Sequence, residues 1–211
     1  MIGRGNDKLK RFELGIKAMK YIIKEVPNCE MKVISQNIDD LKDLVKNLTL
    51  ENNVDFVGYI PHPEIYFKNA SLHIFPTVSE SFGYVLSETK IYGIPNIMLG
   101  LDYVSISKGG TIIVYDESGK TIGKEAIKIL NNKTYKKELG KEARKSMKVF
   151  DNKLLFKRWI KLILSIYNGE KYYHLIREKD KKISSNDSFN ILQNQIHLLK
   201  IRMEKYNNIT S

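Results

Sequence analysis

The chain has 211 residues, of which 42% are hydrophobic and 28% charged, a composition that suits a folded globular domain with an extension and excludes a disordered polymer. No apolar run reaches the roughly 18 residues of a membrane-spanning helix, and the segment after Met1 lacks the apolar stretch of a signal peptide. Cys29 is the only cysteine, which excludes an internal disulfide and suits a cytoplasmic protein.

The net charge is +11, and three classes of partner would explain it: a nucleic acid, an anionic membrane surface or an anionic small substrate. The lysines are spread along the chain, and no arginine-rich arm, zinc-finger spacing or RNP-type aromatic strand accompanies them. We therefore predict no nucleic-acid partner. Peripheral attraction to the inner face of an anionic membrane stays open, as does the alternative that a lysine-rich, low-GC genome explains the composition.

Short β-like runs alternate with helical patterns from residue 1 to about residue 130. The first helix is predicted to start near Phe12, because apolar residues then recur at spacings of four and three as far as Val26. Strands are predicted over 31–35, 54–57, 72–75, 97–99 and 111–115, and further helices over 38–47, 63–69, 83–92, 121–130, 135–147 and 154–167. Met1 and Ile2 are too few for a strand, so the first strand is expected to be truncated.

This alternation predicts an α/β fold in which residues 1–170 form a single Rossmann-like domain, with one parallel sheet covered by helices on both faces. Ligands of such sheets bind beyond the carboxyl ends of the strands. We therefore expect the site in the loops that follow Ile2, Val57, Phe75 and Leu99.

The composition changes after residue 170. Residues 171–188 are predicted to be a linker, because they end in a polar run of serine, asparagine and aspartate. Residues 189–207 are predicted to form a helix with a heptad seam of Phe189, Leu192, Ile196, Leu199, Met203 and Tyr206. We expect this seam either to mediate self-association through 189–206 or to pack the helix against its own domain.

The first group of residues with a chemical pattern is Gly3-Arg4-Gly5, followed by Lys10 at the entry to the first helix. Glycines let the backbone approach a ligand closely, while the two cations and the helix N-terminus favour an anion. Together they are suited to hold a diphosphate. The alternative is a solvated basic turn.

The second group is Glu80-Ser81-Phe82-Gly83, with Glu88 eight residues after Glu80. It follows a strand and opens a helix, so the backbone N–H groups of Phe82 and Gly83 are expected to face the crevice. A carboxylate such as Glu88 can accept hydrogen bonds from the diol of a ribose, and Glu80 can do the same for a hexose. Alternatively, Glu80 only complements the helix dipole and Glu88 is an exposed helical residue.

Four motifs in order resemble those of the family 4 retaining glycosyltransferases (glycosyl transferases group 1). The run from Phe75 to Glu88 resembles the E-x7-E motif, and Gly93-Ile94-Pro95 resembles the G-x-P that follows it. Gly3-Arg4 with Lys10 is similar to the family's G-R…K phosphate motif. The strand from Val54, with Gly58 after it, resembles the strand and glycine beside the nucleotide base. The resemblance covers about residues 2–170.

The resemblance implies that residues 1–170 are the C-terminal, donor-binding half of a GT-B fold, whose partner would be an N-terminal acceptor domain. Arg4 and Lys10 would then bind the diphosphate, Glu80 the donor sugar and Glu88 the ribose. Gly3, Gly58, Ser81, Phe82 and Gly83 would complete the nucleotide-sugar site. The sequence departs from the family pattern at two places: Ser81 replaces a common glycine, and Thr89, followed by Lys90, replaces the alanine expected after Glu88.

The function implied is hexosyl transfer from a UDP- or GDP-sugar to a glycan or lipid acceptor, with retention, in polysaccharide biosynthesis. No cofactor and no metal are expected, because no D-x-D pair occurs and Arg4 and Lys10 would neutralise the diphosphate. The isolated chain is expected to be inactive without the acceptor domain. The alternatives are a nucleotide-sugar-binding module without catalysis, another GT-B enzyme such as an epimerase, and a basic interaction protein.

Overall fold

The computed structural model of the protein describes residues 1–5, 7–101, 104 and 106–168. The chain divides after Met147 into two units, and the described part of the second unit runs from Lys148 to Asn168. The predicted linker over 171–188 and the heptad helix over 189–207 lie outside the described residues. The domain boundary placed at residue 170 stays a prediction.

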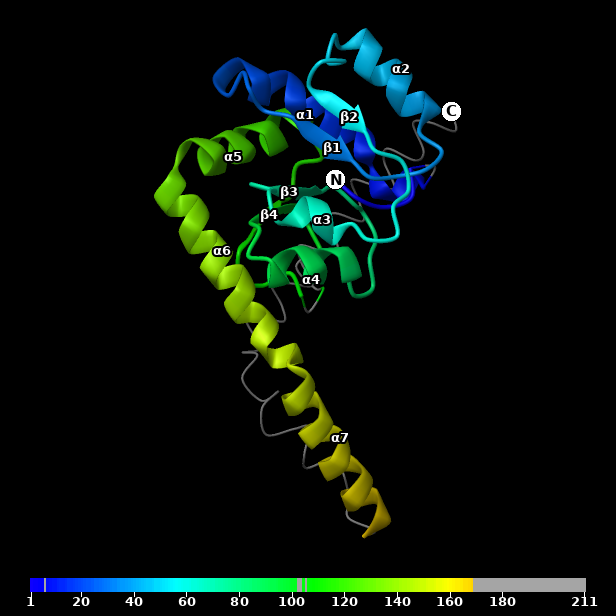
Figure 1. The fold of residues 1–211 in the computed structure, drawn as a ribbon, viewed down its shortest axis with the longest axis vertical. Coiled ribbons are helices and arrows are strands. Elements are labelled where there is room, and N and C mark those ends of the chain that lie inside the picture. Colours follow the sequence, from blue (N-terminus) through cyan, green and yellow to red (C-terminus); the bar gives the residue numbers. More distant parts are fainter. Residues whose placement is uncertain (6, 102–103, 105, 169–211) are drawn as a thin grey trace. The chain divides into compact units, whose positions relative to one another are not determined.

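The first unit alternates helices and strands along its length (Figure 1). Its strands are short: β1 (Met31–Val33), β2 (Val54–Phe56), β3 (His73–Phe75), β4 (Asn96–Leu99) and β5 (Thr111–Val114). Its helices are the 3-10 turn η1 (Lys8–Lys10) and α1 (Phe12–Glu25), α2 (Asp39–Asn47), α3 (Glu64–Phe67), α4 (Tyr84–Ile91), α5 (Gly119–Asn131) and α6 (Lys133–Met147). The predicted strands and helices of this unit are all present, close to their predicted bounds.

The strands pair in parallel, which confirms the α/β prediction. They form two sheets, however, where the alternation predicts one: β1 pairs with β2, and β3, β4 and β5 form a second sheet in that order. Within the described residues the edge of β1 away from β2 is paired only by a bridge between Ile2 and Ile34. Among the described residues no strand ladder joins β1 with β3.

The core is built by the apolar faces that the helical spacing predicts. Phe12, Ile16, Met19 and Ile22 of α1 are all buried, and α1 packs along α5. All four residues of β4 are buried, because this strand lies between β3 and β5 and is covered by helices. Helix α4, which ends just before Gly93, packs against α6. The core thus fixes the strands whose carboxyl ends carry the predicted site.

The described part of the second unit contains the turn η2 (Lys148–Phe150) and helix α7 (Asn152–Tyr167). Asp151 caps α7, because its carboxylate accepts the backbone N–H groups of Lys153 and Leu154. Helix α7 carries exposed apolar side chains, among them Trp159 at 62% and Phe156 at 67% accessible. In the described part of the chain, every helix is too short or too polar to cross a bilayer. Binding of an anionic membrane surface stays a prediction.

Candidate functional site

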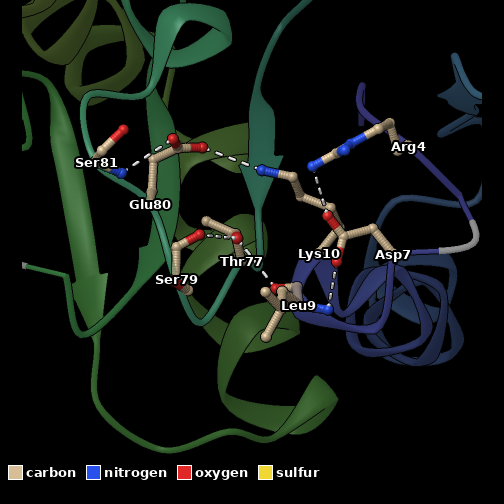
Figure 2. A network of polar contacts seen from close by, with 8 residues as sticks. All are labelled: Arg4, Asp7, Leu9, Lys10, Thr77, Ser79, Glu80 and Ser81. Atoms are coloured by element: carbon tan, nitrogen blue, oxygen red, sulfur yellow. Dashed lines mark hydrogen bonds and ion pairs between the residues drawn. The ribbon is translucent and has the colours of Figure 1, made fainter.

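Two loops meet at the carboxyl ends of the strands. One follows Ile2 and contains η1, and the other follows β3 and leads into α4 (Figure 2). The backbone N–H of Val78 donates to the carbonyl oxygen of Leu9 at 2.8 Å, and the hydroxyl of Thr77 donates to the same oxygen at 3.0 Å. Thr77 is almost fully buried, so water does not compete for these bonds. The two loops are therefore fixed against each other.

Lys10 and Glu80 make direct contact across these two loops (Figure 2). The Lys10 Nζ donates to Glu80 Oε2 at 3.0 Å, and the two side chains are only 17% and 20% exposed. The ammonium also lies 5.8 Å from the ring centroid of Phe75, at the end of β3. The structure thus brings together two of the three residues predicted to bind the diphosphate and the donor sugar.

Glu80 is held as a carboxylate. Burial alone would raise its pKa. The hydrogen bond and charge of Lys10 and the backbone N–H groups of Ser81 and Gly83 all lower the pKa, and together they outweigh burial. The pKa of Glu80 consequently lies below its ordinary value. These N–H groups precede α4, where the helix dipole also favours an anion. Glu80 is thus itself the anion that Lys10 and the start of α4 bind, so a diphosphate would have to share or displace it.

Arg4 lies on the same loop as Lys10 but points into solvent. Its guanidinium pairs with Asp7 at 3.0 Å, and its side chain is 79% exposed. Asp7 in turn caps η1 by accepting the backbone N–H of Leu9. Arg4 therefore lies on the same loop as Lys10, and its ion pair is with Asp7 and not with Glu80. Arg11, by contrast, is held in the body by ion pairs with Glu13 and Glu117.

The turn into α4 depends on Gly83. This residue is the N-cap of the helix and has φ +84°, a left-handed conformation that glycine adopts without strain. The backbone N–H groups of the first helical turn, from Tyr84 onward, have no partner within the helix itself. The ring of Phe82 packs on that of Tyr84 with centroids 5.1 Å apart. The predicted helix therefore begins at Gly83, and the binding of an anion there stays a prediction.

Three further predicted residues make no hydrogen bond to the Lys10–Glu80 pair, although Gly3 lies beside the aliphatic part of Lys10. Glu88 is exposed on α4, and its pKa is raised by partial burial of the carboxyl group and by the charge of Glu64 on α3. Gly58 follows β2 with φ +82°. The backbone of Gly3 takes part in the fold, because its N–H donates to the carbonyl oxygen of Ile34. The hydrogen bonds among the described residues do not join any of the three to Lys10 or Glu80.

Lys90 is a residue of this region whose role the motifs do not indicate. It is fully buried, and its Nζ donates to the carbonyl oxygens of Ile106 and, at 2.8 Å, Lys108. Burial lowers its pKa to about 8. These carbonyls belong to the loop after β4, where Ile106 lies beside Gly83. The one indication of its burial in the sequence is that Lys90 follows the apolar Leu86 by four residues and so lies on the same face of α4.

The other departure from the family pattern, Thr89, is also buried. Its hydroxyl lies 2.9 Å from Oδ1 of Asn96, and this amide oxygen of Asn96 also lies 2.7 Å from Nδ1 of His73. This polar cluster ties α4 to β3 and β4. Among the residues that the structure describes, no group of three His, Cys, Asp or Glu side chains is arranged to hold a metal ion.

The sequence also matches known proteins. The model of the family described as glycosyl transferases group 1 matches residues 1–146. The poly(glycerol-phosphate) alpha-glucosyltransferase of Bacillus subtilis is 22% identical over 187 residues, which are 84% of this chain and 28% of that protein. The capsular polysaccharide biosynthesis glycosyltransferase CapM of Staphylococcus aureus is 27% identical over 140 residues, which are 62% of this chain and 36% of that protein.

Solved structures show the same fold. HepE of Anabaena in complex with UDP superposes with a TM-score of 0.69 at 15% identity, over 78% of this chain and 48% of that chain. The pneumococcal O-GlcNAc transferase GtfA in complex with UDP and GlcNAc gives a TM-score of 0.66 at 20% identity, over 79% and 35% of the two chains. The chain spans less than half of each of these proteins.

Proposed function

The chain belongs to the glycosyl transferases group 1 family, and on this basis we propose that it binds the donor in a glycosyltransferase that moves a sugar from a nucleotide-diphospho-sugar to a glycan or lipid. The observation that carries this proposal is the contact between Lys10 and Glu80 at the start of α4. It places a cation for a diphosphate and a carboxylate for sugar hydroxyls within one hydrogen bond of each other. Glu80 follows β3, at the carboxyl end of a parallel strand, which is where ligands of such sheets usually bind.

In the finer assignment, Lys10 and Arg4 bind the diphosphate and stabilise the charge that develops on it when the bond to the anomeric carbon breaks. Glu80 accepts hydrogen bonds from the sugar and Glu88 from the ribose. Gly58 lies beside the base, while Ser81, Phe82 and Gly83 surround the phosphates and sugar. The acceptor oxygen forms the new bond to the anomeric carbon, and its proton leaves to the departing diphosphate or to solvent. Membership of family 4 and retention of configuration are part of this proposal.

The relatives support a UDP-sugar and an anionic acceptor. HepE and GtfA are solved with UDP, and the Bacillus relative is named for a poly(glycerol-phosphate) substrate. A chain with a net charge of +11 attracts such a polyanion over a distance of about one Debye length. The compartment proposed is the cytoplasm or the inner face of the membrane, where nucleotide sugars are used.

A second candidate is a nucleotide-sugar-binding module that catalyses nothing on its own. It is favoured by the groups that the described residues bring together, since Lys10 and Glu80 account for binding of a donor alone. Holding acceptor and donor in line contributes up to roughly 7 to 11 kcal/mol to catalysis, which one half of a cleft does not supply. A radiolabelled donor assay on this chain, with mixed glycan and lipid acceptors, separates the two candidates, because only the enzyme gives acceptor-dependent transfer.

The donor-binding proposal predicts that the chain binds UDP or GDP without a metal ion. The cations that neutralise the diphosphate are Lys10 and Arg4, so EDTA should leave the affinity unchanged. Calorimetry with both nucleotides, in EDTA and in magnesium, measures this. A requirement for magnesium would contradict the role given to the two side chains.

A second prediction concerns the ribose. Replacement of Glu88 by alanine is expected to weaken UDP binding about tenfold, or roughly 1.4 kcal/mol, because it removes charge-assisted hydrogen bonds. Glu64→Ala is the matched control, since it removes a carboxylate near Glu88 that has no proposed ligand. Equal affinities for the Glu88→Ala variant and the wild type would show that this carboxylate does not bind the nucleotide.

A further inference from the structure

Lys90 is the largest fully buried side chain among the described residues. It lies on α4 and shares the buried face of this helix with Leu86. A lysine is rarely buried in this way, because its ammonium group loses its hydration unless other polar groups replace the water. The donor site proposed above does not use this side chain, so its burial requires a separate explanation.

Two backbone carbonyls replace the water around the ammonium group. Nζ of Lys90 donates to the carbonyl oxygens of Ile106 and, at 2.8 Å, of Lys108. Burial lowers the pKa of Lys90 to about 8, which is still above 7, so the side chain is mainly charged at neutral pH. Hydrogen bonds from a charged donor are stronger than those between neutral groups. Lys90 therefore holds these two carbonyls firmly.

The two carbonyls belong to the β4–β5 segment, residues 100–110, which connects the two strands. Leu101, Val104, Ile106 and Ser107 of this segment are almost fully buried. A connecting segment ordinarily runs over the surface, because the backbone groups of a buried one need hydrogen-bond partners. The Ser107 N–H has a partner in the carbonyl oxygen of Val104, at 2.8 Å. Lys90 provides the partners for the carbonyls at 106 and 108, and thus allows the segment to be buried.

The β4–β5 segment lies against the turn that begins α4. A Cβ atom added to Gly83 would lie 3.5 Å from Cγ2 of Ile106 and 3.6 Å from Cγ of Glu80. Ile106 and Glu80 therefore both pack at Gly83. The N–H groups of Ser81 and Gly83 that lower the pKa of Glu80 belong to the same turn. A displacement of Ile106 would consequently move the turn that carries the proposed donor contacts.

The other end of the segment is held by a different helix. Gly110 packs directly on the backbone of Leu139 and Ala143 in α6, and its carbonyl oxygen accepts the N–H of Asn96 at the start of β4. These contacts fix the segment where it enters β5. The two bonds from Lys90, by contrast, join the carbonyls at 106 and 108 to α4.

We propose that Lys90 is a positioning residue of the donor site, which holds residues 106–108 against the start of α4 and so keeps the turn at Gly83 in the conformation that binds the nucleotide. This role rests on the proposed function, because its effect on a ligand passes through Gly83 and Glu80. Lys90 itself is buried and does not contact the ligand. Without its bonds the turn and the segment become mobile, and ordering them again on binding reduces the affinity.

The test is Lys90→Met in the full chain, which keeps most of the side-chain volume and removes the charge and its N–H donors. We expect the variant to fold, because removal of a buried charge offsets part of the loss of the two hydrogen bonds. The Ser107 N–H should exchange at least tenfold faster than in the wild type, with the N–H of Asn96 as the internal reference. The affinity for UDP, measured by calorimetry, should fall about tenfold.

Thr89→Val is the matched control. Thr89 is adjacent to Lys90 and equally buried, and its hydroxyl bonds to Asn96 and Leu86, which lie outside the β4–β5 segment. This variant should lower the free energy of unfolding but keep Ser107 exchange and UDP affinity within about twofold of the wild type. Equal losses of affinity in the two variants would overturn the proposal, because affinity would then follow general stability. Wild-type affinity in Lys90→Met would overturn it as well.

Chemical rescue provides an independent test. Lys90→Ala leaves a cavity, and such cavities bind small molecules of matching size. Propylammonium should restore both the protection of Ser107 and the affinity for UDP. Tetramethylammonium, which has the same charge but no N–H donor, should restore neither. Equal effects of the two ions would contradict the role given to the N–H donors of Lys90.

The two readouts separate this proposal from the proposed function. A wild-type chain that binds no UDP would refute the donor site, whereas Ser107 exchange, measured without nucleotide, would still show whether Lys90 holds the segment. Conversely, unchanged Ser107 exchange in Lys90→Met, together with a wild type that binds UDP, would refute only the positioning role.

Discussion

Replacement of Lys10 by methionine is expected to weaken UDP or GDP binding by about thirtyfold to a hundredfold, or roughly 2 to 3 kcal/mol. Lys10 is only 17% exposed, so its charge acts in a partly desolvated site where an interaction with a diphosphate is stronger than in water. Methionine keeps much of the length and packing of the side chain beside Phe75, so the variant removes mainly the charge. Calorimetric titration with the nucleotide measures the loss.

The reciprocal variant, Glu80→Gln, makes this test more specific. The carboxylate competes with a diphosphate for Lys10 and for the N–H groups of Ser81 and Gly83. A neutral amide competes less, so we expect Glu80→Gln to bind the bare nucleotide as tightly as the wild type or more tightly. Lys8→Met, an exposed lysine on the same turn, is the control for loss of general positive charge. Equal losses in the Lys8 and Lys10 variants would mean that only net charge attracts the nucleotide.

Much of the fold could be predicted because its signals are local. The spacing of Phe12, Ile16 and Met19 determines which face of α1 is buried, and glycine and proline residues mark the ends of neighbouring elements. The division into two sheets could not be predicted in the same way. It depends on which residues pair with the edge of β1, a long-range property, and in the described part of the chain the bridge at this edge is that of Ile2 with Ile34.

The site was predictable as a set of residues but not as a set of contacts. The motifs indicate Lys10 and Glu80 separately, and a sequence pattern cannot show that 70 positions of chain fold back to place their charges 3.0 Å apart. The buried Lys90 shows a similar limit. A lysine on a short helix is ordinarily exposed, and only the tertiary structure supplies the two carbonyl acceptors that allow it inside.

Gly140 lies inside α6, where the local helix signal and the packing make opposite demands. Alanine favours a helix interior over glycine by about 1 kcal/mol, so propensity alone predicts that Gly140→Ala stabilises the chain. A Cβ atom at this position, however, would lie 2.4 Å from the carbonyl oxygen of Gly93, in the turn that ends α4. Gly93 has φ +74° and is covered by Arg144, whose guanidinium donates to the carbonyl of Tyr92 at 2.8 Å. The contact is therefore between backbones, and neither one can move alone.

We expect Gly140→Ala to lower the free energy of unfolding by about 2 to 3 kcal/mol, because the overpacking of α4 against α6 exceeds the gain in helix propensity. Chemical denaturation followed by circular dichroism measures this loss. Gly58→Ala is the matched control, since it meets no atom within 4 Å and costs only the strain of φ +82°, about 1 kcal/mol. If Gly140→Ala is instead as stable as the wild type, α6 does not pack on the turn at Gly93. The G-x-P motif would then have to be explained without the close approach of Gly93 and Gly140.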